Sequence, residues 1–129
     1  MIQINLFVGS RYPINRKQLR ATAARVLAAQ RITHAQIDIS IVGERKIKEL
    51  NEGKLKHDGI TDVLSFPQHE HKQLGDFPMP EGIPPHLGDV VICFPEAVRT
   101  AKRFGKMVDD QLSFYLEHGM MHLLGYHHD

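Results

Sequence analysis

Apolar and polar residues alternate with a period of two in two segments of the chain, residues 2–6 and 37–41. This alternation is typical of a β-strand that buries one face. Two further segments, 62–66 and 87–94, are short and rich in apolar and β-branched residues, and each is followed closely by a proline. We therefore predict four strands, the third of which is stopped by Pro67 because proline cannot donate a ladder hydrogen bond.

Between these segments the apolar residues recur every three or four positions, as they do along the buried face of a helix. The first predicted helix follows Asn15, and Gln18 three residues later gives it a start that resembles a capping box. Its apolar face carries Leu19, Ala23, Val26 and Leu27. A second, short helix is expected over residues 44–51, ending near Gly53.

Two more helices are predicted in the C-terminal part of the chain. Pro95 suits the first turn of a helix over residues 96–104, and Gly105 would close that helix. Asp109 is expected to cap the last helix. The resulting order βαβαββαα indicates a single α+β domain over residues 1–129, in which helices cover a small mixed four-stranded sheet.

Composition narrows the class of protein. Of the 129 residues, 42% are hydrophobic and 24% are charged, as in a globule able to bury a core. No stretch approaches the ~20 apolar residues of a membrane span, and the start has no leader pattern, so we expect a cytoplasmic protein without a membrane partner. The single cysteine, Cys93, lies in an apolar run and is predicted to be a core residue. Residues 68–86 hold four of the seven prolines and are expected to form a long, functional loop.

Charge is distributed unevenly along the chain. Residues 1–37 hold six of the 16 basic residues and none of the 15 acidic ones. The six are Arg11, Arg16, Lys17, Arg20, Arg25 and Arg31. This asymmetry has two interpretations, a surface that faces a polyanion and a solvated helix face, and the sequence alone leaves both open.

Near the C-terminus the spacing HxxxHxxGxxH is typical of a metal site made of three histidines. His118 and His122 are four residues apart and would share one face of a helix. Gly125 is suited to end that helix in the left-handed conformation, so that His128 can turn back toward the same ion. Three neutral imidazoles with an open fourth position suit one Zn²⁺ per chain, although nickel, cobalt and copper also accept such ligands.

The same spacing occurs in zinc proteases, where a glutamate follows the first histidine and acts as general base. Here Gly119 occupies that position, and Glu117 would face another side of the helix. Gly119 instead suggests close packing, or room for something to approach the metal. His127 falls off the spacing and is interpreted as an exposed turn residue. The motif therefore predicts a metal site and argues against peptide hydrolysis.

Three sequence blocks resemble those of the YbeY family, bacterial metal-dependent endoribonucleases that act in ribosomal RNA maturation. The blocks are Thr61-Asp62-Val63-Leu64-Ser65-Phe66-Pro67, Leu87-Gly88-Asp89-Val90-Val91-Ile92, and the segment from His118-Gly119 through His122-Leu123-Leu124-Gly125-Tyr126 to His128. The resemblance implies a single-strand-specific endoribonuclease that works with ribosomal RNA and the small ribosomal subunit. It also implies that His118, His122 and His128 hold the metal.

The chain departs from the family pattern at three places. The family has aspartate where His127 stands, and its members usually continue with an acidic helical tail, whereas this sequence ends at Asp129. Where the family has a Tyr-Arg pair, with the arginine implicated in cleavage, this chain has Lys54 and Leu55. Leucine cannot grip a phosphate as the planar guanidinium does, so Lys54 and Lys56 are the cations left in this loop.

Together these features favour a zinc-dependent endoribonuclease in which a metal-activated water hydrolyses a phosphodiester. The predicted RNA-binding residues are Arg16, Lys17, Arg20, Lys54 and Lys56. Weak candidates for a catalytic role are Lys54, Lys56 and Asp129, and His127 and Asp62 are further candidates for the general acid. The alternative is a non-catalytic RNA-binding ribosome-assembly factor with a structural metal, which the leucine at position 55 favours.

Overall fold

The computed structural model describes residues 1–9, 11–53, 61–68 and 84–125. In chain order the elements are β1 (Ile2–Val8), α1 (Arg16–Ala29), β2 (Ala35–Val42), α2 (Glu44–Gly53), β3 (Val63–Pro67), β4 (His86–Cys93), α4 (Phe94–Phe104) and α5 (Val108–Leu123). This is the expected order βαβαββαα. The strands form one sheet in the order β1-β2-β4-β3. Pairing is parallel between β1, β2 and β4 and antiparallel between β4 and β3, so the predicted mixed sheet is confirmed.

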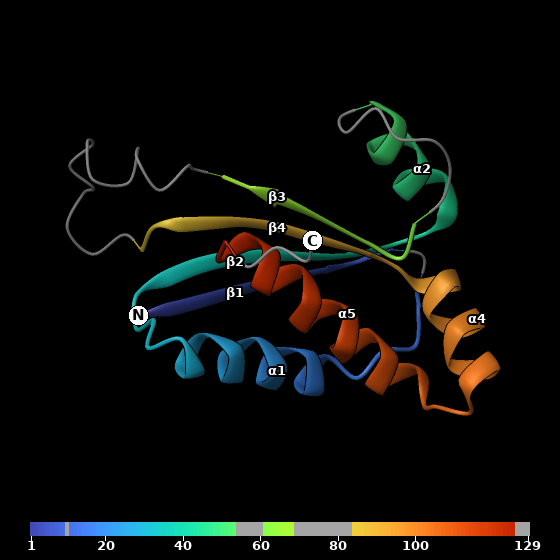
Figure 1. The fold of residues 1–129 in the computed structure, drawn as a ribbon, viewed down its shortest axis with the longest axis horizontal. Helices are drawn as coiled ribbons and strands as arrows, with labels where there is room; N and C mark the ends of the chain where they lie inside the picture. The colour runs from blue at the N-terminus through green and yellow to red at the C-terminus, as the bar shows by residue number, and fades with distance from the viewer. Residues whose placement is uncertain (10, 54–60, 69–83, 126–129) are drawn as a thin grey trace.

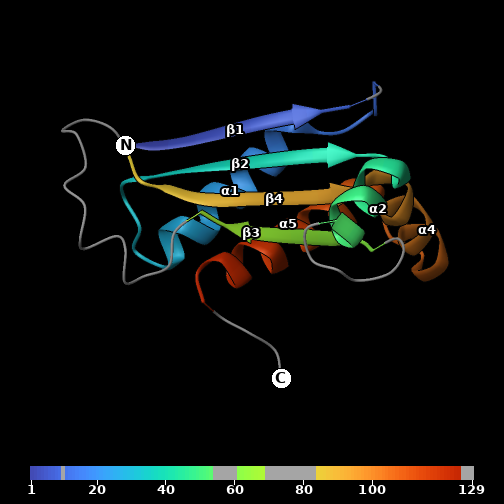
Figure 2. The same cartoon turned by 90° about the horizontal axis from the view of Figure 1, so that it is seen from above.

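Helices lie on both faces of the sheet but cover them unequally. α1 and α5 lie side by side under one face, α4 packs at one end, and α2 lies on the opposite face (Figures 1 and 2). The main core lies between the sheet and the α1–α5 layer. Its fully buried side chains include Leu19, Leu27, Ile37, Ile39, Ile41, Val90, Ile92, Leu112, Leu116 and Met120. The period-two alternation of β2 thus sends its isoleucines to the helices and leaves the polar residues between them on the other face.

A smaller cluster lies under α2. It contains Ile47 of α2, Leu64 of β3, and Val91 and Cys93 of β4. Cys93 is fully buried, as predicted, and burial raises the pKa of its thiol. α2 therefore lies over one end of the second sheet face (Figure 1).

The junction between α1 and α5 differs from the predicted capping. The Asn15 side chain does cap α1, since its Oδ1 accepts a hydrogen bond from the Gln18 amide at 3.0 Å. The returning half of a capping box is absent, because the Asn15 amide donates to Asp109 Oδ1 at 2.9 Å and the Gln18 side chain donates to Asp110 at 2.9 Å. The prediction that Asp109 caps α5 is wrong: α5 begins after Met107, which makes no side-chain cap bond. The Asp109 carboxylate instead accepts the hydrogen bond from the Asn15 amide, which is distant in the sequence.

Two glycines allow β3, β4 and α5 to approach closely. A Cβ on Gly119 would lie 2.7 Å from Cγ1 of Val90 and 3.2 Å from Cγ2 of Val63. Gly88 has φ +145°, and a Cβ there would overlap the carbonyl oxygen of Phe66. Larger residues at either position would force the layers apart. The three sequence blocks quoted above thus lie on elements that pack directly on one another.

Candidate metal centre

The last turns of α5 present His118 and His122 side by side. The helix buries Leu116, Gly119 and Met120, so residues 118 and 122 fall on its flank, where both are partly buried. Their Nε2 atoms are 3.1 Å apart and their ring centroids 4.7 Å apart. The predicted i, i+4 pairing of the two rings is therefore present.

This spacing fits two ligands of one ion. Two nitrogens that each lie ~2.0–2.1 Å from a tetrahedral zinc are about 3.3–3.4 Å apart. The observed separation of 3.1 Å between the two Nε2 atoms needs only a small ring adjustment to match it. The described part of the site thus suits a divalent transition metal.

The end of α5 also follows the expectation for a metal-binding turn. Gly125 has φ +94°, and its amide donates to the carbonyl oxygen of His122 at 3.1 Å. Because L-residues rarely adopt such a backbone, glycine here lets the chain leave the helix axis directly after Leu124. The predicted third ligand His128, together with His127 and Asp129, lies outside the described residues.

The structure shows what Gly119 does at the position of the protease glutamate, and whether Glu117 can take the place of that glutamate. Gly119 faces the sheet and meets Val63 and Val90, so its small size serves helix–sheet packing. The interpretation that it leaves room at the metal is wrong. Glu117 carries its carboxylate 3.1 Å from the guanidinium of Arg25 on α1, away from the histidine rings, as expected.

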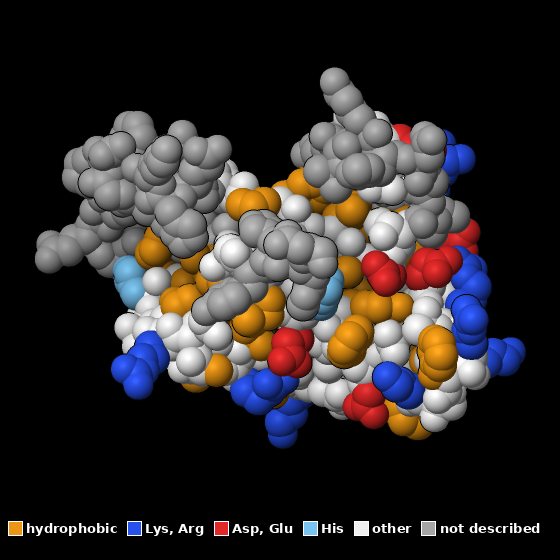
Figure 3. All heavy atoms as spheres, viewed as in Figure 1, with side chains coloured by type: hydrophobic (Ala, Val, Ile, Leu, Met, Phe, Trp, Pro, Cys, Tyr) orange, Lys and Arg blue, Asp and Glu red, His pale blue; other side chains and the backbone are white. Residues whose placement is uncertain are grey.

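The basic residues of α1 differ in their surroundings. Arg16 and Lys17 are exposed in the first turns of the helix. Arg20 is exposed too, but its Nη1 donates to the carbonyl oxygen of Ile4 at 2.6 Å, so part of its hydrogen-bonding capacity holds α1 to β1. Figure 3 shows Lys and Arg side chains over the region of α1, with acidic side chains beside them. The predicted RNA contacts Lys54 and Lys56, and Leu55 between them, lie outside the described residues.

Asp62, a candidate general acid, has a structural role. Its Oδ1 accepts a hydrogen bond from the Val63 amide at 2.7 Å, and its carbonyl oxygen accepts one from the Cys93 amide at 2.8 Å. These bonds shape the start of β3 beside β4.

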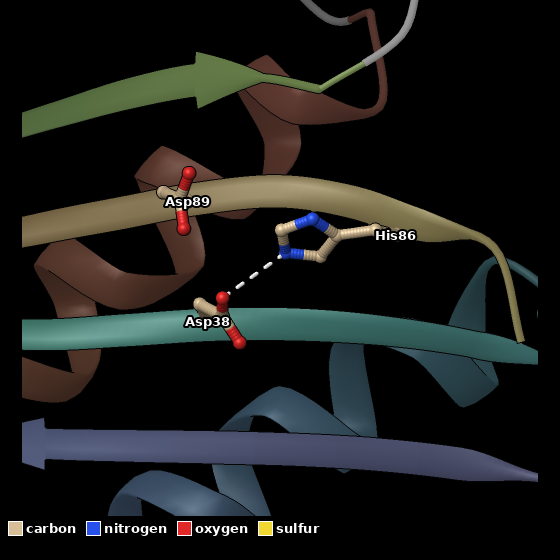
Figure 4. A group of neighbouring side chains, drawn as sticks. All are labelled: Asp38, His86 and Asp89. Carbon is tan, nitrogen blue, oxygen red and sulfur yellow. Dashed lines mark ion pairs between the residues drawn. The ribbon is translucent and has the colours of Figure 1, made fainter.

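A second group of side chains that could hold a metal ion was not anticipated from the sequence. Asp38 of β2 and His86 and Asp89 of β4 each offer one ligand atom, and these atoms lie within 4.8 Å of one another (Figure 4). No short spacing joins residue 38 to residues 86–89. The available signal was the polar position of Asp38 in its alternating strand, together with the pairing of that strand with the segment that contains Leu87-Gly88-Asp89.

The family model described as Endoribonuclease YbeY matches residues 8–129. A protein of Anaeromyxobacter sp. (strain Fw109-5) named Endoribonuclease YbeY is 43% identical over 113 residues, which cover 88% of this chain and 54% of that protein. One of the same name from Dehalococcoides mccartyi (strain CBDB1) is 36% identical over 135 residues, covering 98% of this chain and 81% of the relative.

A solved structure shares the fold. The solution structure of TM1509 from Thermotoga maritima superposes with a TM-score of 0.59 at 27% identity, covering 100% of this chain and 75% of that one. The chain spans only about half the length of the Anaeromyxobacter relative. The family match nevertheless extends over nearly the whole sequence and includes all three blocks that carry the resemblance. The chain therefore belongs to the YbeY family.

Proposed function

We propose that this protein is a metal-dependent endoribonuclease of the cytoplasm that acts on single-stranded segments of ribosomal RNA during maturation of the small ribosomal subunit. The observation that carries the proposal is the pair of Nε2 atoms 3.1 Å apart on α5, in a chain of a family described as endoribonucleases. His118, His122 and His128 would hold one Zn²⁺. The described residues contain no helix long and apolar enough to cross a membrane.

The protein's own residues have defined tasks in this mechanism. His118 and His122 must be neutral so that each can offer its Nε2 lone pair, and the packing of α5 on the sheet fixes their separation. A divalent ion held there would act as a Lewis acid on the phosphoryl group and activate a water. Arg16, Lys17 and Arg20 would bind phosphates of the RNA backbone, which positions the strand without reading its sequence.

The loop cations and the proton donor complete the proposal. Lys54 and Lys56 would meet the charge that develops on the phosphate, in place of the arginine that the family has at the position of Leu55. The proton for the leaving oxygen would come from His127 or Asp129. Leu55→Arg is then expected to raise single-turnover cleavage by 10²–10³, the scale of a donor aimed at a developing oxyanion.

Cleavage of ribosomal RNA by the metal-loaded protein tests the proposal. Wild-type protein should cut the RNA, and His118→Ala or chelation should reduce cutting to background. His34→Ala is the matched control, because His34 is an exposed histidine on the loop before β2 and contacts the N-terminal amine. Equal cutting by wild type, His118→Ala and the chelated sample would attribute the activity to a contaminant and overturn the proposal.

The leucine at position 55 favours one alternative, a non-catalytic RNA-binding factor whose metal is structural. This alternative predicts that metal-loaded protein binds ribosomal RNA and leaves it intact, and that His118→Ala lowers thermal stability. The same samples therefore separate the two functions.

A further inference from the structure

The face of the sheet opposite α1 and α5 carries two carboxylates in directly paired positions. Asp38 of β2 and Asp89 of β4 are register partners, so they stand next to each other on adjacent strands. Val90 follows Asp89 and contacts Gly119 of α5, which means that Asp89 points to the other side of the sheet. Like charges directly opposite each other on adjacent strands destabilise the strand pair.

The backbone brings a histidine to the same place. The register of β2 and β4 shifts between Gln36 and Ile37, so that His86 pairs with Gln36 while Gly88 pairs with Ile37. The imidazole of His86 extends from its strand toward both carboxylates (Figure 4). Its Nε2 lies 3.3 Å from Oδ2 of Asp38.

The burial and hydrogen bonding of His86 Nε2 give a further reason to expect a ligand here. The atom is out of contact with solvent, and the geometry toward Asp38 does not make a hydrogen bond, so Nε2 has no hydrogen-bond partner. A desolvated polar atom without a partner is costly and uncommon in folded proteins. Asp38 Oδ1, by contrast, accepts a hydrogen bond from Asn5 Nδ2 at 2.8 Å, which orients the carboxylate and leaves Oδ2 facing His86.

We propose that Asp38, His86 and Asp89 form a second divalent-cation site, separated from the histidine site of α5 by the thickness of the sheet. Two ligand atoms of one ion with bonds of ~2.0–2.2 Å are at most about 4.4 Å apart. The three ligand atoms lie within 4.8 Å of one another, so side-chain rotation of a few tenths of an ångström brings them into range. The 3.3 Å between His86 and Asp38 is already close to the spacing of neighbouring ligands.

The donor set indicates which cation the site takes. Two carboxylates and one imidazole are harder ligands than three imidazoles, and they leave positions for water, which suits Mn²⁺ better than a soft thiophilic metal. The bound ion would neutralise the paired carboxylates, satisfy Nε2 and join β2 to β4. Because it binds only the folded sheet, it would stabilise the protein in proportion to its occupancy.

Titration of the full chain with Mn²⁺, followed by the loss of the free-ion EPR signal, tests this site. The protein is first loaded with Zn²⁺ so that the α5 site is filled. Wild type should then bind one equivalent of Mn²⁺ with a rise in melting temperature. His86→Gln and Asp89→Asn should each weaken Mn²⁺ binding at least tenfold and abolish the rise. Asp89→Asn removes a like charge and is expected to stay folded.

Matched variants separate the proposed site from the other sources of binding. His34→Gln and Asp110→Asn change an exposed histidine and an exposed aspartate elsewhere, and should leave Mn²⁺ binding unchanged. His122→Ala should also keep the Mn²⁺ site, which makes the result independent of the proposed ribonuclease function. Three results would each overturn the inference. They are no saturable Mn²⁺ binding in wild type, undiminished binding in Asp89→Asn, and loss of binding in His122→Ala alone.

Discussion

Two groups of potential metal ligands lie on opposite sides of one sheet and are assembled in different ways. His118 and His122 are four residues apart on α5, so the geometry of a single helix brings their Nε2 atoms to 3.1 Å. Asp38 is separated from His86 and Asp89 by more than forty residues, and only the parallel pairing of β2 with β4 brings them together. The first group depends on local structure and the second on the tertiary register.

This difference determines how sensitive the geometry of each group is to changes in the surrounding fold. A helix that forms at all retains its i, i+4 neighbours, whereas a slip of one residue between two strands moves every side chain to the other face. Each group also contains one glycine, and the two glycines differ in whether they contact side chains or backbone. Gly119 lies between the two histidines and faces a valine side chain, while Gly88 lies between His86 and Asp89 and faces backbone.

The largest expected effect is on the helical group. His122→Ala should weaken zinc binding by roughly 100-fold or more, because changing even a partner of a metal ligand commonly costs 10–100-fold. Competition with a chelator of known affinity measures this loss, and His34→Ala serves as control. Zinc affinity that stays the same in His122→Ala would remove α5 from metal binding.

The next effect compares the two glycines through the stability of the metal-free protein. Gly88→Ala should lower the free energy of unfolding by about 3 kcal/mol, since it combines a strained positive φ with overlap on the Phe66 carbonyl. Gly119→Ala should cost only about 1 kcal/mol, because the gain in helix propensity offsets part of the crowding against Val90. Urea denaturation of both variants measures the difference. Equal losses would show that the sheet group is no more dependent on backbone geometry than the helical one.

Much of the fold was predictable because its signals are local. Alternation placed β1 and β2, and short apolar segments followed by proline placed β3 and β4. Asn15, Gly105 and Gly125 mark helix ends where the structure has them. Capping at α5 was mispredicted because Asp109 found a partner 94 residues away in the backbone of Asn15. The histidine pair followed from helical spacing, whereas the cluster of Asp38, His86 and Asp89 required the strand order and a register shift that no pattern along the chain specifies.

The next prediction concerns the end of β4 that α2 covers, on the same sheet face as Asp38 and Asp89. Its expected effect is intermediate in size. Cys93 is buried there, and desolvation raises the pKa of its thiol, so the folded protein holds less thiolate at pH 8–9 than the unfolded chain does. Alkylation of Cys93 should therefore be at least tenfold slower in native protein than in urea. Because the thiol pKa is higher in the folded protein, the contribution of Cys93 to the free energy of unfolding is fully present below the ordinary thiol pKa. This contribution is lost as the pH rises above that pKa. Equal alkylation rates would mean that α2 does not protect this end.

The smallest expected effect concerns the surface beside the helical group. Arg16 and Lys17 are exposed at the start of α1, so in the proposed function they would contact RNA phosphates without supporting the fold. Changing both to glutamine should weaken RNA binding severalfold and reduce the slope of log affinity against log salt by about 0.7 for each lost contact with a single strand. Lys102 and Arg103, exposed near the end of α4, provide a control pair with the same change in charge. If both pairs lower affinity equally, the effect reflects net charge alone, and the basic start of α1 is a solvated helix face. If only the α1 pair changes the slope, the RNA path runs along the side of the sheet that carries His118 and His122.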